Sequence, residues 1–311
     1  MGEEAALELP EAVNQVRAFW NTEACGTHFV RHFVDDRDFF RKYREFRYRT
    51  EWHIPEFARF ADGADRQVLE IGCGNGADGF MFASHGASYT GVDLTAEAVE
   101  ATRRHFAAEG VAGTFRQQNC EHLSYGDEAF DLVYSFGVLH HTPAPGQAIR
   151  EVHRVLRPGG VARVMLYHRN SFNYYVRILG WMRARAIFEV LRRAPRWEAD
   201  RARMSDGIAG VRGNSDGKVW EVHYQNFLRQ GWSYFRPENF AHHCTDGPEC
   251  PYAYTCTERV ARRLFGRFRS VRISVAHLPL NKYPLARLLP RSVERWLAGR
   301  FGWHLLIEAV K

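Results

Sequence analysis

The stretch RQVLEIGCGNGADGF, residues 66–80, constrains the fold of this chain more than any other part of it. Its first half is a short apolar run that predicts a buried strand, and GFMFASHG after the glycines predicts a helix. The glycines between them permit positive φ angles and close approach of the backbone to a ligand, and the helix N-terminus offers free N–H groups. The stretch therefore predicts a nucleotide-binding α/β unit, although Gly74-x-Gly76-x-x-Gly79 also satisfies the dinucleotide pattern GxGxxG.

Four further features separate the two kinds of nucleotide site. Glu70 precedes the first glycine, where it can organise the loop and face a cationic ligand. A second predicted strand ends at Asp93, whose carboxylate can accept hydrogen bonds from both hydroxyls of a ribose. A third ends at Asn119 and Cys120, at the height of an adenine. A fourth, AFDLVYSFGVLHHTP, is followed by a helix, the turn RPGG and a fifth strand. Together these features decide against an ordinary dinucleotide site.

The series VLEIGCGNG, GVDLT, QQNCEHL, FDLVYSFGVLHH and EVHRVLRPGGVARVML, within residues 40–167, resembles the class I S-adenosylmethionine-dependent methyltransferases. The resemblance implies an α/β fold with a seven-stranded, mainly parallel, doubly wound Rossmann-like sheet. It also implies S-adenosyl-L-methionine as the cofactor and S-adenosyl-L-homocysteine as its product, and we expect no metal. The residues that it assigns to the cofactor site are Glu70, Gly72, Cys73, Gly74, Gly76, Asp93, Leu94, Asn119, Cys120, Glu121, Ser135, Phe136 and His140.

The same resemblance gives these residues roles. The three glycines would wrap the methionine part of the cofactor, Glu70 would lie near its amino group and Asp93 would hold the ribose. Many relatives have an acidic residue where this chain has Asn119, whose amide oxygen can still accept a hydrogen bond from the adenine N6. The backbone N–H of Cys120 would reach a ring nitrogen of the adenine.

The segment DDRDFFRKYREFRYRTEWHIPEF, residues 35–57, alternates aromatic and basic residues at helical spacing. It predicts either an amphipathic helix packed on the sheet or a lid over the cofactor. A lid would place Tyr43, Tyr48 or Arg47 against the methionine carboxylate and the sulfonium. An aromatic face suits a sulfonium cation through cation–π attraction.

A hundred-residue excursion follows the fifth predicted strand, where a methyltransferase core needs only a short helix. We therefore expect an N-terminal helical arm or lid over residues 1–60 and a cofactor-binding core over 61–167. An inserted lid and substrate subdomain would occupy 168–267, with a hinge at 205–217. The last two strands, the final one antiparallel, would complete the core over 268–311.

A sulfonium carries its own leaving group, so catalysis is mainly alignment of the incoming nucleophile with the methyl carbon. A base is needed only where the acceptor must lose a proton. The candidate bases are His168, His223 and His141, each of which is otherwise a structural histidine. The residues expected to form an apolar acceptor pocket, or else part of the core, are Trp220, Tyr224, Trp232 and Tyr234.

The stretch HHCTDGPECPYAYTC, residues 242–256, contains Cys244, Cys250 and Cys256. Zinc sites bring ligands together in closely spaced pairs such as C-x2-C. The spacing here is C-x5-C-x5-C, and the chain has no second pair elsewhere. We interpret the stretch as a turn-rich lid loop with reduced thiols; a metal site and thiols that bind a soft substrate such as a metalloid are the alternatives.

Charge and composition bear on partners and location. The formal net charge is +6, but only four of the 42 basic residues are lysines, which resembles a codon bias more than a phosphate-binding groove. The first residues lack an apolar signal-peptide core and no run approaches a membrane span, so we expect a cytoplasmic protein, monomeric or homodimeric.

The predicted activity is methyl transfer to an O or C atom of a small-molecule acceptor, such as a secondary metabolite or a quinone- or isoprenoid-like compound. One alternative is an RNA or protein methyltransferase that docks through the arginine-rich C-terminal half. No RNA-binding module is recognisable in the sequence, which makes nucleic acid an unfavoured partner. The other alternative is a protein that binds S-adenosylmethionine without transferring its methyl group.

Overall fold

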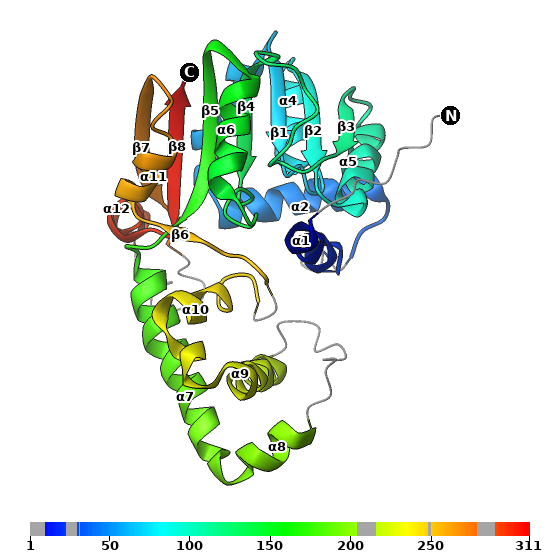
Figure 1. Cartoon of the computed structure of the whole chain (residues 1–311). Helices are drawn as coiled ribbons and strands as arrows, with labels where there is room; N and C mark the ends of the chain where they lie inside the picture. The colour runs from blue at the N-terminus through cyan, green and yellow to red at the C-terminus, as the bar shows by residue number, and fades with distance from the viewer. Residues whose placement is uncertain (1–9, 23–29, 31, 204–215, 248–249, 279–289) are drawn as a thin grey trace. The chain divides into compact units, whose positions relative to one another are not determined.

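The computed structural model describes residues 10–22, 30, 32–203, 216–247, 250–278 and 290–311 (Figure 1). The chain forms two compact units. The first contains residues 1–164, 267–269 and 309–311, and the second contains residues 165–266 and 270–308. The predicted hinge at 205–217 lies almost entirely outside the described residues.

The first unit contains the elements that the glycine-rich stretch predicts. It begins with helices and continues as alternating strands and helices up to a strand shared with the second unit. In chain order these elements are α1 (Glu11–Thr22), α2 (Asp36–Thr50), α3 (His53–Ala58), the 3₁₀ helix η2 (Phe60–Gly63), β1 (Gln67–Ile71), α4 (Ala77–Ser84), β2 (Ser88–Asp93), α5 (Ala96–Glu109), β3 (Thr114–Gln117), β4 (Phe130–Phe136), α6 (Pro145–Val155) and β5 (Leu156–His168).

The second unit is mostly helical between the end of β5 and the last strands. Its elements are the π-helix η3 (Asn173–Met182), α7 (Arg183–Arg192), η4 (Ala194–Arg196), α8 (Trp197–Arg203), α9 (Asp216–Gln230), η5 (Gly231–Phe235), α10 (Pro237–His242), β6 (Thr255–Cys256), α11 (Glu258–Leu264), β7 (Ser270–Ala276), α12 (Arg291–Phe301) and β8 (His304–Val310). The N-cap of α11 is Thr257, whose hydroxyl accepts a hydrogen bond from the Val260 N–H.

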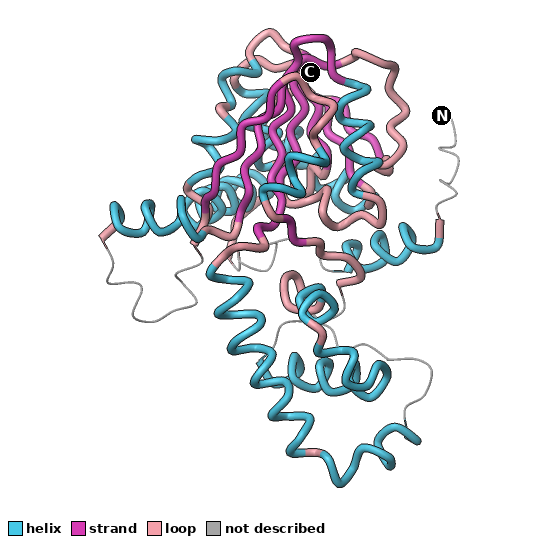
Figure 2. Tube along the Cα trace, turned by 60° about the vertical axis from the view of Figure 1, so that its left-hand side comes forward, coloured by secondary structure: helices cyan, strands magenta, loops and turns pink. Residues whose placement is uncertain are grey.

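The strands form one sheet in the order β3-β2-β1-β4-β5-β8-β7, and the two-residue β6 pairs with the end of β5 (Figure 2). β1 pairs in parallel with both β2 and β4. β8 is antiparallel to its neighbours, because backbone hydrogen bonds join Gly159 to Lys311 and His168 to Trp303. The predicted mainly parallel α/β sheet with an antiparallel final strand is therefore confirmed.

The core of the first unit explains why its central strands are so apolar. Val68 of β1 lies in register with Tyr89 of β2 and Leu132 of β4, and all three are buried in one cluster with side chains of α3, α4 and α5. Parallel strands covered by helices on both faces lack the alternation of exposed and buried residues. β1 accordingly ends in four consecutive buried residues, which places the glycine turn at a rigid edge of the sheet.

The second unit has a core of its own, formed by one helical run and the elements around it. The buried members are Tyr174, Ile178, Met182, Ala186, Val190, Tyr224, Phe227, Leu228, Tyr234, Phe235, Phe240, Ala241, Cys244 and Trp303. Along η3 and α7 these residues recur at every fourth position, as expected for one buried stripe of a helix. In the part of the chain that the structure describes, no helix is both long and apolar enough to span a bilayer.

Candidate cofactor and active site

The turn after β1 is built on glycines that no other residue could replace without strain. Gly72, Gly74 and Gly76 have φ angles of 81°, 57° and 77°. A Cβ on Gly72 would lie 2.1 Å from a methyl carbon of Val138. A Cβ on Gly74 would meet no atom within 4 Å, because this residue faces open space. The turn therefore packs closely against the loop after β4 at Gly72 and leaves room for a ligand at Gly74.

A cavity of about 220 Å³ adjoins this turn within the first unit. It lies at the carboxyl ends of the central strands, where ligands bind in open α/β sheets. The predicted cofactor residues that line it are Tyr43, Glu70, Gly72, Cys73, Gly74, Asp93, Leu94, Asn119, Cys120 and Phe136. Residues that the family resemblance assigns to the cofactor therefore lie around one cavity, and their contact with a cofactor stays a prediction.

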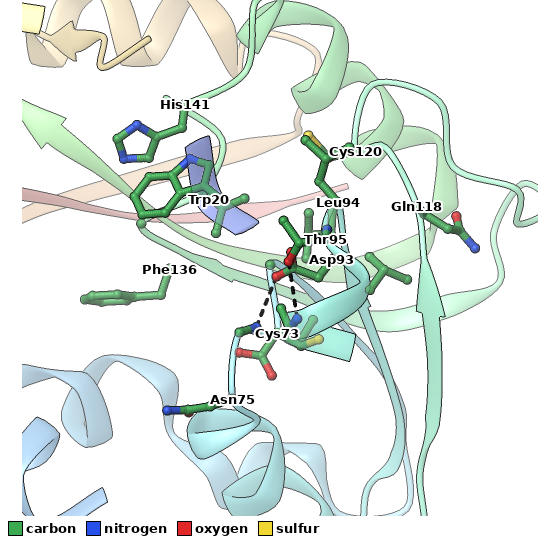
Figure 3. Close-up of a pocket in the computed structure, with 18 of the residues that line it drawn as sticks. Trp20, Cys73, Asn75, Asp93, Leu94, Thr95, Gln118, Cys120, Phe136 and His141 are labelled. Atoms are coloured by element: carbon green, nitrogen blue, oxygen red, sulfur yellow. Dashed lines mark hydrogen bonds between the residues drawn. The ribbon is translucent and has the colours of Figure 1, made fainter. Parts of the chain in front are cut away.

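Asp93, at the end of β2, is held against the glycine turn (Figure 3). Its Oδ2 accepts a hydrogen bond from the Gly74 N–H at 3.1 Å, and its Oδ1 accepts from the N–H and the hydroxyl of Thr95, each at 3.0 Å. Burial raises the pKa of Asp93, and these hydrogen bonds act in the opposite direction. A carboxylate has about four acceptor sites, so Oδ2 retains capacity for a ligand hydroxyl.

Glu70 is a buried carboxyl whose environment suits a cation. Its Oε2 accepts a hydrogen bond of 2.5 Å from the Tyr89 hydroxyl. Gly91 makes this contact possible, since a Cβ there would lie 2.6 Å from the same hydroxyl. Burial, and after it the Asp78 carboxylate, raise the pKa of Glu70 well above its usual range. A ligand ammonium beside Glu70 would offset both effects by stabilising the ionised form.

Helix α2 is fastened to the start of α4 by a buried network around Asp78. Arg47 donates to both carboxylate oxygens of Asp78, at 3.2 and 2.9 Å. The hydroxyls of Tyr48 and Tyr134 donate to the same carboxylate, each at 3.0 Å. Arg47 and Tyr43 line the cavity, whereas Tyr48 holds Asp78. Residues 35–57 thus contribute directly to the cavity wall.

Helix α1 also lines the cavity; it lies within the arm or lid predicted over residues 1–60, but none of its residues was assigned to the site. Val13, Val16 and Trp20 line the cavity from this helix. The Trp20 ring meets the His141 ring edge-on, with centroids 5.0 Å apart. Figure 3 shows Trp20, Phe136 and His141 toward one side of the cavity, with Leu94, Gln118 and Cys120 toward the other. The available sequence signal was the helical spacing of Val13, Val16 and Trp20, which places them on one face. The acidic and small residues between and before them made this pattern hard to recognise.

A relay of side chains connects α2 to the glycine turn. The Nδ1 of buried His105 hydrogen-bonds the backbone carbonyl of Asn75 at 2.8 Å, and its Nε2 lies 2.7 Å from a guanidinium nitrogen of Arg44. Because a carbonyl and a guanidinium impose opposite roles, Nδ1 donates and Nε2 accepts. Arg44 also pairs with Glu109 at 3.0 Å. Burial lowers the pKa of His105 to about 4, which favours this neutral ring.

Asn75 was not predicted to meet the cofactor, yet its side chain lines the cavity. It is 9% exposed, and its Nδ2 has no hydrogen-bond partner among the described residues. A buried amide donor without a partner is costly in a folded protein. A polar ligand atom in the cavity would satisfy it.

The far side of the cavity fits a flat heterocycle. Leu94, Gln118, Asn119 and Cys120 line it. The Asn119 side-chain oxygen accepts from the Glu121 N–H at 3.0 Å, which sets a tight turn and leaves a second lone pair. Burial raises the pKa of the Cys120 thiol to about 12, so this cysteine is a neutral wall residue.

Three predicted cofactor residues support the wall from behind. Glu121 accepts hydrogen bonds from the Thr142 hydroxyl and, at 2.8 Å, from the Ala144 N–H, and so fixes the loop after β4. The Ser135 hydroxyl donates to the Ile71 carbonyl at 3.0 Å. His140 is 1% exposed. Glu121 and Ser135 thus fix segments that line the cavity, and the His140 ring packs against the ring of His141 with centroids 4.3 Å apart.

The three candidate bases lie in different surroundings. His141 lines the cavity of the first unit. His168 lies in the second unit, buried, with its Nδ1 3.0 Å from the Gly302 carbonyl. His223 also belongs to the second unit, where its Nδ1 hydrogen-bonds the Tyr234 hydroxyl at 2.5 Å. Burial lowers the pKa of His223 to about 3.

The four aromatic residues predicted to bind the acceptor are close together in the second unit. Tyr224 and Tyr234 are buried in its core, and Trp220 packs against that core. The Tyr224 hydroxyl donates to Asp200 at 2.8 Å. Trp232 is 53% exposed, with its ring against Phe227.

Four of the five described cysteines are buried, and Cys120 is half-buried. Cys73, Cys120, Cys244, Cys250 and Cys256 are free, while Cys25 lies outside the described residues. Burial raises the pKa of Cys256 to about 11 and also raises those of the other four. The Cys250 Sγ donates to the Tyr252 carbonyl at 3.2 Å. At neutral pH these thiols are protonated, which makes them weak nucleophiles.

Comparison with known proteins agrees with this geometry. Residues 69–164 match a family described as a methyltransferase domain. Over 118 residues the chain is 35% identical to the ubiquinone biosynthesis O-methyltransferase of Pseudomonas aeruginosa, covering 38% of this chain and 51% of the relative. The protein of the same name from Aeromonas salmonicida is 32% identical over 116 residues, covering 37% and 49%.

The chain thus spans about half the length of the curated relatives it matches. Among solved structures, an S-adenosylmethionine-dependent methyltransferase from Mesorhizobium loti superposes with a TM-score of 0.47 at 17% identity. That superposition covers 83% of this chain and 97% of the other.

Proposed function

Because residues 69–164 form a class I S-adenosylmethionine-dependent methyltransferase domain, we propose that the protein transfers a methyl group to an oxygen or carbon atom of a small-molecule acceptor. The observation that carries the proposal is the convergence of the glycine turn, Asp93 and Trp20 on one cavity. The similarity to O-methyltransferases supports an oxygen atom of a quinone-like compound as the acceptor.

The cavity residues fit the cofactor in charge and shape. We expect the open side of Gly74 to receive the methionine part and the buried Glu70 to meet its ammonium. Arg47 and Tyr43 would lie near the methionine carboxylate. Asp93 would accept from the ribose hydroxyls, and the oxygen of Asn119 from the adenine N6. The unpartnered Nδ2 of Asn75 gives the cavity one further donor.

S-adenosylmethionine supplies an electrophilic methyl group on a sulfonium that is its own leaving group. The protein then has to align an acceptor atom, exclude water and remove a proton where the acceptor has one. We assign the wall of Trp20 and Phe136 to alignment and water exclusion. His141, at the same side of the cavity, is the base that we favour, and it would take the proton of an acceptor hydroxyl as the new O–C bond forms.

The second unit is proposed to select the acceptor. His168 and His223 remain candidate bases, and Trp220, Tyr224, Trp232 and Tyr234 remain candidate acceptor contacts. The neutral state that burial imposes on His223 suits a base that is free to accept a proton, but its low pKa makes it a weak one. Measuring methyl transfer after substitution of His141, His168 or His223 by asparagine would show which of the three acts as the base.

Cofactor binding is tested by calorimetry with S-adenosylmethionine on the full chain. Asp93→Ala removes a half-buried carboxylate that would hold two hydroxyls, so we expect affinity to fall by about a hundredfold. Asp127→Ala is the matched control, since that carboxylate is mostly exposed and lies outside the cavity. Equal affinity of both variants and the unchanged protein would contradict the assignment of the site.

Methyl transfer is tested by incubating the protein with methyl-labelled cofactor and a bacterial extract, then separating small molecules from RNA and protein. Label in the small-molecule fraction supports the proposal, and its loss in His141→Asn with cofactor affinity retained supports the base. Label in RNA or protein would overturn the acceptor class. Cofactor binding without label in any fraction would favour a protein that binds S-adenosylmethionine without transfer.

A further inference from the structure

The longest helical run of the second unit is apolar on two sides. η3 and α7 together form an uninterrupted helix from Asn173 to Arg192. Its inward side supplies five buried residues to the core of the unit, namely Tyr174, Ile178, Met182, Ala186 and Val190. Figures 1 and 2 both show α8, α9 and α10 on one side of the run. A helix covered from one side normally presents polar residues on the other.

The outward side is instead apolar. Five large side chains on this helix are about half exposed or more: Tyr175 (54%), Val176 (47%), Trp181 (66%), Phe188 (57%) and Leu191 (52%). Gly180 and Ala184, which are also exposed, lie between them. A contiguous apolar stripe of this kind marks an interaction surface in a folded protein, whereas single exposed apolar residues do not. We call these five side chains the outer stripe.

Positive charge predominates around the outer stripe, although Arg193 also pairs with Glu221 of α9 at 2.6 Å. Residues 172–196 contain six arginines, at 177, 183, 185, 192, 193 and 196, and a single acidic residue, Glu189. Glu189 is buried against the helix and pairs with Arg185 at 3.0 Å and with Arg192 at 2.8 Å. The helix therefore combines aromatic and aliphatic side chains with a net positive charge.

We propose that the outer stripe docks on the surface of an anionic lipid bilayer. Helices that lie in a membrane interface bury tryptophan, phenylalanine and leucine below the headgroups and place arginines beside the lipid phosphates. Here Trp181, Phe188 and Leu191 would be buried below the headgroups, and the flanking arginines would lie beside the phosphates. Arginine also keeps its charge while its aliphatic stem covers apolar surface.

The charge argues against a second copy of this chain as the occupant. Two outer stripes packed together would bring two sets of arginines into one interface, with a single acidic residue on each helix to offset them. Like charges at a protein interface weaken association, whereas phosphates of an anionic bilayer attract the same arginines. The proposal does not depend on methyl transfer, because binding to lipid is measured without cofactor or acceptor.

The test is sedimentation of the full chain with vesicles of phosphatidylcholine and with vesicles of an equimolar phosphatidylcholine and phosphatidylglycerol mixture. We expect binding to the anionic vesicles that weakens as salt is added, and little binding to the neutral ones. The double variant Trp181→Glu and Phe188→Glu should bind at least about tenfold more weakly, because two large apolar side chains are lost from the interface.

The matched control is Trp296→Glu on α12, which changes another exposed tryptophan, 68% exposed, of the same unit. It should bind as the unchanged protein does, and circular dichroism should show that all variants are folded. Equal binding of the double variant and the unchanged protein would overturn the proposal. So would equal binding to both lipids, or no binding. A change from dimer to monomer in the double variant without lipid would assign the stripe to self-association instead.

Discussion

The glycine-turn edge of the first unit and the helical core of the second bury polar groups in different ways. Around the cavity, the buried carboxyls of Glu70 and Asp78 and the half-buried one of Asp93 share hydrogen bonds with tyrosines, backbone N–H groups and one arginine. In the second unit, buried polar side chains stand singly beside an apolar cluster: His223 meets the Tyr234 hydroxyl, and the one buried carboxylate of the helix η3–α7, Glu189, pairs with Arg185 and Arg192. The hydrogen bonds around the cavity fix the positions of individual polar atoms. The apolar core of the second unit requires only that its side chains fill the available volume.

The family match falls on the first of these two regions. The family match covers residues 69–164, which contain the turn and the strand ends around the cavity. Apolar cores tolerate many replacements of similar volume. A network of buried charges tolerates few, because a group that loses its partner is left uncompensated. Substitutions in the two units should therefore differ in how much unfolding free energy they cost and in whether they also weaken cofactor binding.

The largest effect is expected at Gly72. Gly72→Ala would place a side chain at a positive φ and bring its Cβ to 2.1 Å from Val138. We therefore expect the free energy of unfolding to fall by about 4 kcal/mol. We also expect no measurable cofactor binding. Gly110→Ala is the control, because Gly110 has a φ of 69° and open space around it. It should cost about 1 kcal/mol, measured by urea denaturation. Similar costs for both would mean that the turn is less tightly packed than its geometry indicates.

The second effect concerns pH and His105. Its pKa is about 4 in the folded chain against 6.5 ordinarily, so the unfolded chain binds the proton more readily between these values. The contribution of His105 to the free energy of unfolding is therefore complete above pH 6.5. It decreases by about 3 kcal/mol as the pH drops toward 4. Protonation would place a charged ring against Arg44 and loosen the Asn75 carbonyl.

The measurement is urea denaturation across this pH range with His105→Asn, whose amide can still donate to the Asn75 carbonyl. The variant should lose the part of the pH dependence that lies between pH 4 and 6.5. His32→Asn, at an exposed position, is the control and should retain it. An identical pH profile in both variants would show that His105 does not couple the turn to the proton concentration.

How far the sequence predicted these features depends on the range of the interactions. The strands, the glycine turn and the places of Asp93 and Asn119 follow from local patterns, since each strand end is fixed by a short apolar run. The Asp78 network and the His105 relay join residues from α2, α4 and α5. Such contacts depend on how helices pack over the sheet, which no local pattern specifies.

Helix α1 is another element whose packing could not be predicted from a local sequence pattern. Its apolar positions predict a helix face but not the surface that the face covers. The arm or lid was predicted over residues 1–60, with its candidate ligand contacts in residues 35–57, and Tyr43 and Arg47 do line the cavity. Trp20 lines the cavity as well, although it was predicted only to pack.

Trp20 therefore gives the third prediction, an intermediate effect. Trp20→Ala removes a large apolar side chain from the cavity wall, so we expect cofactor affinity to fall by about tenfold while the fold is retained. Trp181→Ala, an exposed tryptophan of the second unit, should leave the affinity unchanged. Calorimetry of both variants decides between a lid and a helix that merely packs nearby; unchanged affinity in Trp20→Ala would favour the latter.

The smallest effect is expected where a hydroxyl is removed from the second unit. Tyr234→Phe keeps the ring and leaves the Nδ1 of His223 without its 2.5 Å partner, which should cost about 1 kcal/mol of unfolding free energy and leave cofactor affinity unchanged. Tyr89→Phe makes the same chemical change beside Glu70 in the first unit. It should cost about 2 kcal/mol and weaken cofactor binding, because a buried carboxyl loses a donor. If both variants lose stability equally and neither affects binding, the carboxyl network is structural rather than part of the site.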